Sequence, residues 1–136
     1  MEGFDKFNVI ILGIIFDPKN KKVLIGRREN DPNIPELTWC FPSGRAVQGE
    51  DIDKTLKRVV KEKTGYVVKN LGTFFSKTYP EKDDLIGIYF LTQVFEGEEK
   101  PGDDIVELKW VHPKELKSHF TTSFHKKLDE FLNNLV

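Results

Sequence analysis

Runs of Ile, Val and aromatic residues alternate with short charged or Pro- and Gly-containing segments, which predicts a strand-rich chain. Residues 8–16 form the most apolar run and are typical of a buried strand. The segment "DPKNKK" has turn composition, so we expect residues 23–28 to form a second strand paired with the first as a hairpin. "ENDPNIPEL" predicts a surface loop. Further strands are predicted at residues 38–41, 66–79, 85–95 and 105–111, with the charged turn "PEKDD" between the two long ones.

Apolar residues at helical spacing, about 100° per residue, indicate two helices. One face of residues 52–64 carries Ile52, Leu56, Val59 and Val60, with Lys63 among them. Asp51 is a suitable N-cap for this helix, and Gly65 suits the left-handed position after its last turn. The second helix, residues 123–135, has an apolar face made of Phe124, Leu128, Phe131, Leu132 and Leu135. The order of elements predicts an α+β fold in which a mixed sheet lies between helices.

Length and composition predict one soluble globular domain over residues 1–136. A net charge of −1 argues against bulk nucleic-acid binding, and the longest apolar run, residues 9–16, is too short to span a membrane. Cys40 is the only cysteine, so an internal disulfide is impossible and a cytoplasmic location fits. Cys40 lies in the apolar run "TWCF", where a buried structural thiol is favoured over a reactive one.

The segment before the first helix combines glycines with acidic residues. Gly44 and Gly49 allow the backbone to approach a ligand closely, and Glu50 precedes the positive end of the helix. Arg58 and Glu62 are four residues apart, so their side chains are able to pair. The apolar periodicity by itself favours a plain amphipathic helix with a glycine-rich loop before it. The alternative is a site for a metal-bound pyrophosphate.

This segment resembles the Nudix box of the Nudix hydrolases, a motif that runs G, five residues, E, seven residues, then R-E-U-x-E-E-x-G-U, with U a bulky apolar residue. The matching positions are Gly44, Glu50, Arg58, Val60, Glu62, Gly65 and Tyr66. "VLIGRR", "TWCFPSG" and "LKWVHPKEL" are similar to the strand before the box, its approach and a late strand and turn of the family. The resemblance covers nearly the whole chain.

The resemblance implies a hydrolase of nucleoside diphosphates linked to another moiety, working with Mg²⁺ or Mn²⁺. It assigns Glu62 and Glu50 as catalytic residues and metal ligands. Val59 and Lys63 stand where the family has glutamates, which changes the charge of these two positions from −2 to +1. Ser43 replaces the first glycine of the family's G-G pair. We therefore expect metal-dependent activity to be weakened or lost, and the alternative is an inert nucleotide-binding sensor or interaction domain that needs no metal.

Acidic residues near the late strand offer replacement metal ligands. Asp103, Asp104 and Glu107 lie in "EKPGDDIVELKW", and Asp104 is our candidate to join Glu62 and Glu50 at a metal ion. The simpler interpretation of these acids is a solvated turn.

Lys63 suggests a second way to bind a diphosphate, because a fixed ammonium supplies positive charge without a metal. In this hypothesis Lys63 contacts the diphosphate together with loop amides of Ser43 and Gly44. Further donors would come from Arg27, Arg28 and Arg45. The alternative is a lysine whose stem packs on the apolar face while its tip lies in water. The resemblance also allows a homodimer.

The spacing of His112, His119 and His125 matches no metal-binding motif. Aromatic residues that are candidates for stacking on a base, most of them expected in the core, are Trp39, Phe41, Phe74, Phe75 and Tyr79.

Overall fold

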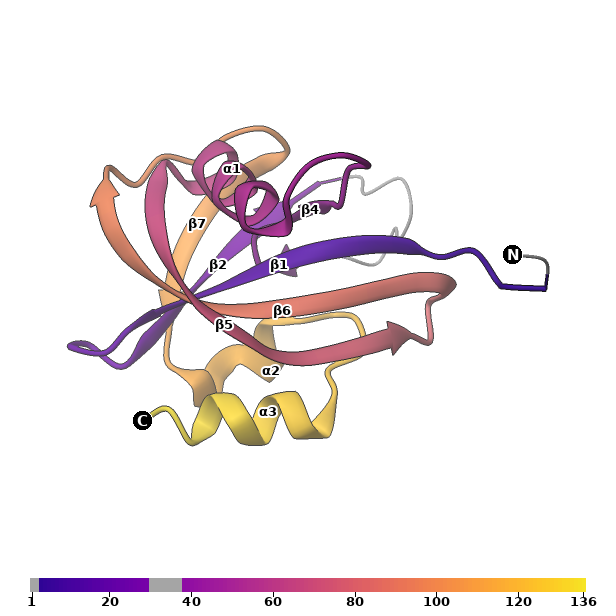
Figure 1. The fold of residues 1–136 in the computed structure, drawn as a ribbon. Helices are drawn as coiled ribbons and strands as arrows, with labels where there is room; N and C mark the ends of the chain where they lie inside the picture. Colours follow the sequence, from indigo (N-terminus) through magenta and orange to yellow (C-terminus); the bar gives the residue numbers. More distant parts are fainter. Residues whose placement is uncertain (1–2, 30–37) are drawn as a thin grey trace.

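A computed structural model describes residues 3–29 and 38–136 (Figure 1). The strands of these residues are β1 (Asn8–Asp17), β2 (Lys22–Arg28), β3 (Trp39–Cys40), β4 (Ser43–Arg45), β5 (Tyr66–Tyr79), β6 (Lys82–Gly97) and β7 (Ile105–Val111). The helices are α1 (Ile52–Thr64), the short 3₁₀ turn η1 (Pro113–Glu115), α2 (Leu116–His119) and α3 (Lys126–Asn133). The α+β class predicted from the sequence is confirmed.

β1 is the central strand, and its pairing makes the sheet mixed. It runs parallel to β6 from Asn8↔Leu85 to Ile15↔Thr92, and β5 pairs antiparallel with the other edge of β6. The predicted hairpin between β1 and β2 forms only next to the turn, at Phe16↔Val23 and Asp17↔Lys22. Beyond that point β2 pairs with β7 and β3, while β1 pairs with β4.

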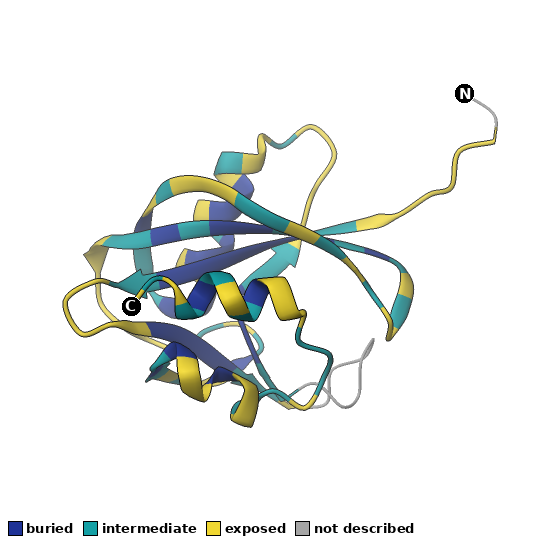
Figure 2. Cartoon of the chain, turned by 90° about the horizontal axis from the view of Figure 1, so that it is seen from below, coloured by how far each residue is buried: buried dark blue, intermediate teal, exposed yellow. Residues whose placement is uncertain are grey.

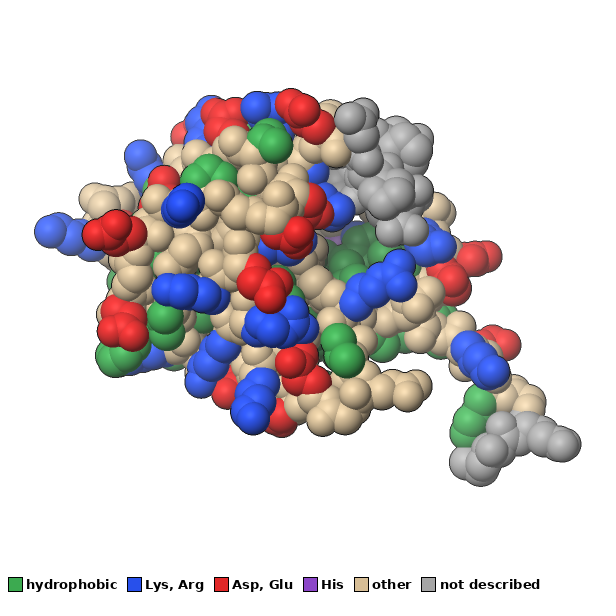
Figure 3. All heavy atoms as spheres, turned by 90° about the horizontal axis from the view of Figure 1, so that it is seen from above, with side chains coloured by type: hydrophobic (Ala, Val, Ile, Leu, Met, Phe, Trp, Pro, Cys, Tyr) green, Lys and Arg blue, Asp and Glu red, His purple; other side chains and the backbone are tan. Residues whose placement is uncertain are grey.

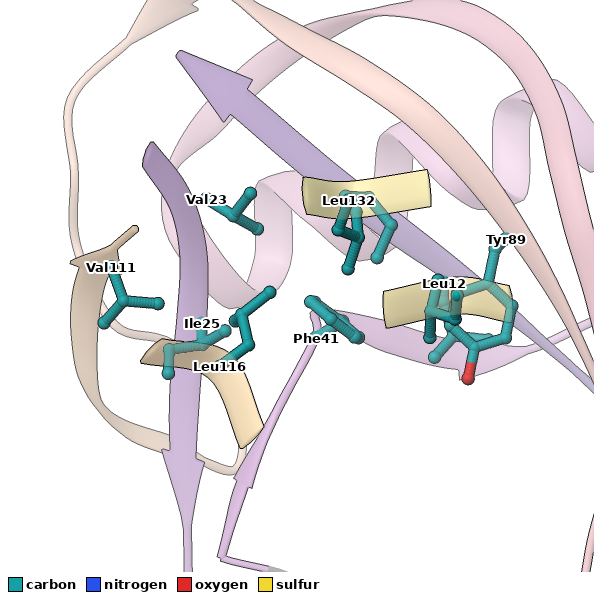
Figure 4. Close-up of a cluster of buried hydrophobic side chains, with 10 residues drawn as sticks. Leu12, Val23, Ile25, Phe41, Tyr89, Val111, Leu116 and Leu132 are labelled. Atoms are coloured by element: carbon teal, nitrogen blue, oxygen red, sulfur yellow. The ribbon is translucent and has the colours of Figure 1, made fainter. Parts of the chain in front are cut away.

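Helices cover both faces of the sheet, with α1 on one side and α2 and α3 on the other (Figure 1). Side chains alternate along β1 accordingly. Ile11 and Ile15 pack in a cluster that includes Leu56 and Val60 of α1. Leu12 and Ile14 belong to the opposite cluster, which also contains Phe41, Tyr89, Leu128 and Leu132 (Figure 4). Buried residues therefore follow the central strands, with exposed residues on the outer sides of the helices (Figure 2).

Helix α1 has the predicted bounds, because its apolar spacing and its terminal residues indicate the same start and end. Asp51 occupies the N-cap position, although its side chain makes no capping hydrogen bond. Gly65 is left-handed, with φ 80°, as expected.

Several local predictions differ from the structure. The turn between β5 and β6 is shorter than "PEKDD", because β6 already begins at Lys82. Residues 43–45, predicted as loop, form β4 through pairing with β1. The last helix begins at Lys126 rather than residue 123, and η1 and α2 precede it. Most of the loop predicted at residues 29–37 lies outside the described residues. No helix among the described residues is long and apolar enough to cross a membrane.

Candidate functional site

A cavity of about 420 Å³ opens between β1, α1 and the segment that joins α2 to α3. Figure 3 shows hydrophobic side chains inside a hollow on this side of the molecule and basic side chains at its rim. We call one part of the lining the charged end, formed by Arg28, Arg58, Glu62, Lys63 and Asp103. The other part, the aromatic end, is formed by Phe41, Tyr79, Tyr89 and Phe120.

Val59 and Lys63 both line this cavity, as expected for residues one helical turn apart. Val59 is 2% exposed and packs directly on Gly44 of β4. A Cβ atom at position 44 would lie 2.5 Å from Cγ2 of Val59. The glycine is therefore needed here for close packing of β4 on α1.

Lys63 is buried, and its charge is balanced inside the protein. Its Nζ lies 2.6 Å from Asp104 Oδ1 and 3.3 Å from Asp103 Oδ2, and the side chain is only 9% exposed. Asp104 also bonds Arg28, with 2.6 Å between Oδ2 and Nη2. The alternative in which the lysine tip lies in water is therefore wrong. Its ammonium donates one hydrogen bond, to Asp104 Oδ1, and pairs electrostatically with Asp103.

The loop between β6 and β7 brings these acids to α1. The Lys100 N–H donates to the carbonyl of Thr64 at 2.8 Å, and the Gly102 N–H donates to that of Lys63 at 3.2 Å. These bonds satisfy carbonyls at the end of the helix that have no partner within it. Gly102 lies against the backbone of Glu62, where a Cβ atom would clash. The loop is thus held by backbone contacts, and Asp103 and Asp104 follow directly.

Glu50 and Glu62 are joined through Arg58. Arg58 bonds Glu50 with Nη2–Oε1 at 2.9 Å and Nε–Oε2 at 3.2 Å, and its Nη1 lies 3.4 Å from both oxygens of Glu62. Glu50 also accepts a 2.6 Å hydrogen bond from Thr55. Hydrogen bonds from Arg58, then Thr55, lower the pKa of Glu50 to about 2. Glu62 lines the cavity, whereas Glu50 lies outside its lining.

The described side chains do not fit a divalent cation in this arrangement. Each of the three predicted ligands, Glu50, Glu62 and Asp104, already has a basic partner. Residues 3–29 and 38–136 contain no group of three or more His, Cys, Asp or Glu residues placed to hold a metal ion. Mg²⁺ demands near-octahedral oxygen ligation, which these paired carboxylates do not offer. The assignment of these ligands stays a prediction.

The remaining predicted binding residues divide between the cavity and the outside. Ser43, Gly44, Arg28 and Arg45 line the cavity. The Arg45 side chain is exposed at the rim and forms no ion pair with any described residue. Arg27 is absent from the lining, since it bonds Glu107 and Glu29, each at 2.8 Å.

Two of the four residues of the aromatic end were expected from the sequence and two were not. Phe41 and Tyr79 were among the stacking candidates, whereas Tyr89 and Phe120 were not. Tyr89 was missed because it looks like one more apolar position of a strand, and its neighbour on β5 cannot be read from local sequence. Trp39, Phe74 and Phe75 do not line the cavity. Cys40 is buried, as predicted, and its thiol lies 3.6 Å from the carbonyl oxygen of Gly26.

Comparison with known proteins identifies the family. The model described as NUDIX domain matches residues 6–134. The chain therefore belongs to the Nudix hydrolase family, whose enzymes typically use divalent metals.

The chain matches only part of the length of its curated relatives. An ADP-ribose pyrophosphatase of Methanocaldococcus jannaschii is 34% identical over 107 residues, which is 75% of this chain and 60% of that protein. Nucleoside diphosphate-linked moiety X motif 6 of Xenopus laevis is 38% identical over 65 residues, 48% of this chain and 29% of that protein. The chain thus spans less than two thirds of the length of either relative.

Solved structures share the fold. A NUDIX hydrolase from Nitrosomonas europaea has a TM-score of 0.73 at 17% identity and covers 96% of this chain and 70% of its own. A bifunctional NMN adenylyltransferase/ADP ribose pyrophosphatase from Francisella tularensis, solved with AMP and a manganese ion, has a TM-score of 0.74 at 17% identity. That match covers 98% of this chain and 43% of the other.

Proposed function

We propose that this Nudix chain binds a nucleoside diphosphate linked to another moiety in the cavity, with metal-dependent hydrolysis weakened or lost. The observation that carries the proposal is the ion cluster of the buried Lys63 with the partly buried Asp104 and Arg28. It lies where the resemblance to the Nudix box expects carboxylates free to bind a metal. The lysine and its partners balance one another, so the cluster neither attracts a cation strongly nor leaves a carboxylate free for it.

ADP-ribose is the first ligand to test. It is the substrate that the name of the Methanocaldococcus jannaschii relative gives for that protein. The cavity volume of about 420 Å³ lies in the range of small-molecule sites.

Arg45 is the cation best placed to hold the diphosphate. Its guanidinium is exposed at the cavity rim and has no carboxylate partner among the described residues, so it is free for bidentate contact with phosphate oxygens. Lys63 also lines the cavity, but its charge is balanced by Asp104 and Asp103. Arg45 follows Ser43 and Gly44 directly on β4, and all three residues line the cavity.

Calorimetric titration with ADP-ribose tests binding and metal dependence together. We expect equal affinity in Mg²⁺ and in excess chelator, and about a tenfold loss in Arg45→Ala. Arg27→Ala is the matched control, because Arg27 is outside the cavity lining and should leave affinity unchanged. Collapse of binding in the chelator would contradict the metal-free mode.

A double variant tests why hydrolysis is weak. Val59→Glu with Lys63→Glu restores carboxylates at both positions, and we expect it to gain Mn²⁺-dependent cleavage of ADP-ribose. Wild-type protein and Val59→Glu alone are the controls. A double variant that binds Mn²⁺ but does not cleave would show that more than these two ligands is missing.

An inert nucleotide sensor is the second candidate, favoured by the same ion cluster. Retained binding of ADP-ribose with no turnover in wild type, under any divalent metal, would support the sensor over a slow hydrolase.

A further inference from the structure

Tyr79 and Tyr89 form a pair of phenols in the aromatic end of the cavity. Their hydroxyl oxygens are 3.1 Å apart, and both side chains line the cavity. Tyr79 is the last residue of β5, and Tyr89 lies on the neighbouring strand β6. Gly87 makes room for Tyr79, because a Cβ atom at position 87 would lie 2.5 Å from the Tyr79 hydroxyl oxygen.

The pair holds one more hydroxyl hydrogen than it uses. Two phenols carry two hydrogens, and their mutual bond uses one of them. Neither hydroxyl has another hydrogen-bond partner among residues 3–29 and 38–136. Either hydroxyl can donate within the pair, so the unused hydrogen lies on Tyr79, which is half-buried, or on Tyr89, which is 4% exposed and where an unpaired donor is costly.

Both phenols remain protonated near neutral pH. Burial raises the pKa of Tyr79 to about 12 and raises that of Tyr89 further. The pair is therefore an uncharged hydrogen-bond donor.

The surroundings of the pair suit a flat heteroaromatic ring. Phe41 contacts Tyr89 edge to face, with ring centroids 6.3 Å apart, and also packs on Phe120 at 5.0 Å. Leu12 and Leu85 complete the apolar lining. Glu81 and Ser123 also line the cavity, but they bond each other, with the Ser123 N–H at 2.6 Å and its hydroxyl at 2.8 Å from the Glu81 carboxylate. The rings of the lining suit a nucleobase, which presents apolar faces and a few acceptor atoms at its edge.

We propose that the Tyr79–Tyr89 pair is a specificity-determining site that donates a hydrogen bond to an acceptor atom of the ligand's nucleobase. This proposal rests on the proposed binding function and adds the orientation of the ligand. The base would lie at the aromatic end, and the diphosphate would extend toward Arg45 and the charged end.

Tyrosine-to-phenylalanine variants test the proposal, since they remove a hydroxyl and keep the ring. Titrations with ADP-ribose would compare wild type, Tyr79→Phe, Tyr89→Phe and the double variant. Tyr66→Phe is the matched control. Tyr66 is the remaining tyrosine of the chain, bonds Glu99 and lies outside this cavity. Inorganic pyrophosphate serves as the ligand without a base, and thermal unfolding checks that each variant is folded.

We expect the double variant, and the single variant that lacks the donating hydroxyl, to bind ADP-ribose about tenfold more weakly. Pyrophosphate binding and the Tyr66→Phe variant should be unchanged. Wild-type affinity in both single variants would overturn the proposal while leaving the binding function intact. An equal loss for pyrophosphate would also overturn it, because the pair would then act on the diphosphate. A wild-type protein that binds no ADP-ribose would refute the binding function itself.

Discussion

The two ends of the cavity satisfy their polar groups in opposite ways. At the charged end, Lys63 meets Asp104 and Asp103, and Arg58 meets Glu50 and Glu62, so the charges satisfy one another within the protein. At the aromatic end, two phenols share a single hydrogen bond and retain an unused donor. The difference teaches that the charged end has little left to offer a metal ion, whereas the aromatic end keeps a hydrogen-bond donor that is not used within the pair.

The largest stability effect is expected in the aromatic end. Phe41 is 2% exposed and contacts Tyr89, Phe120 and Phe124. Phe41→Ala should lower the free energy of unfolding by about 3 kcal/mol, because it leaves a cavity among these rings. Urea denaturation measures the loss. Phe41→Leu, which keeps most of the volume, should lose less than half as much, and equal losses would mean that packing is not the cause.

Removal of one acid from the charged end should cost somewhat less. Asp104→Ala leaves the buried Lys63 ammonium with only Asp103, and we expect a loss of about 2 kcal/mol, less than for a fully buried pair because Asp104 is 33% exposed. The control is Glu107→Ala, whose partner Arg27 is more exposed, so its loss should be clearly smaller. Similar urea midpoints for the two variants would show that the ion cluster does not depend on burial.

Substitution of Gly44 tests how tightly β4 packs on α1 beside the charged end. Gly44→Ala introduces a methyl group against Val59 and should destabilise the protein by about 1 to 2 kcal/mol. Val59→Ala in the same chain should relieve the clash, so the double variant should be more stable than the sum of the single losses predicts. A strictly additive result would mean that the two residues do not press on each other.

The smallest effect concerns the pH dependence of Glu50. Its pKa lies at about 2 in the folded protein, below its ordinary value of 4.5, so ionised Glu50 stabilises the fold above pH 4.5. This contribution is lost as the pH falls from 4.5 toward 2. Glu50→Gln should be less stable than wild type at neutral pH, and the difference should shrink over that range of acid. Denaturation curves at several pH values measure it, and a difference that stays constant would contradict the ion pair with Arg58.

The sequence predicted α1 well because every local signal agreed. The apolar spacing of residues 52–64 and the left-handed Gly65 define the helix without help from distant contacts. β4 was missed because "SGR" has no strand pattern of its own, and its conformation comes from pairing with Ile10, Ile11 and Leu12.

The sequence predicted which residues line the site but not which side chains they bond. The Nudix-box positions placed Val59, Glu62 and Lys63 around one cavity, as found. The acids of the late loop were predicted to be either replacement metal ligands or part of a solvated turn, and the structure shows Asp103 and Asp104 paired with Lys63. Residue 104 lies 41 positions further along the chain than Lys63, so the choice between metal and ammonium as its partner depends on how the loop docks.

The most direct test of the central claim is the rate at which purified wild-type protein cleaves ADP-ribose with Mn²⁺, measured beside the Val59→Glu, Lys63→Glu variant. We predict little or no cleavage by wild type and a clear gain in the variant. Rapid Mn²⁺-dependent cleavage by the wild-type chain would contradict the claim that the Lys63–Asp104–Arg28 cluster has displaced the metal.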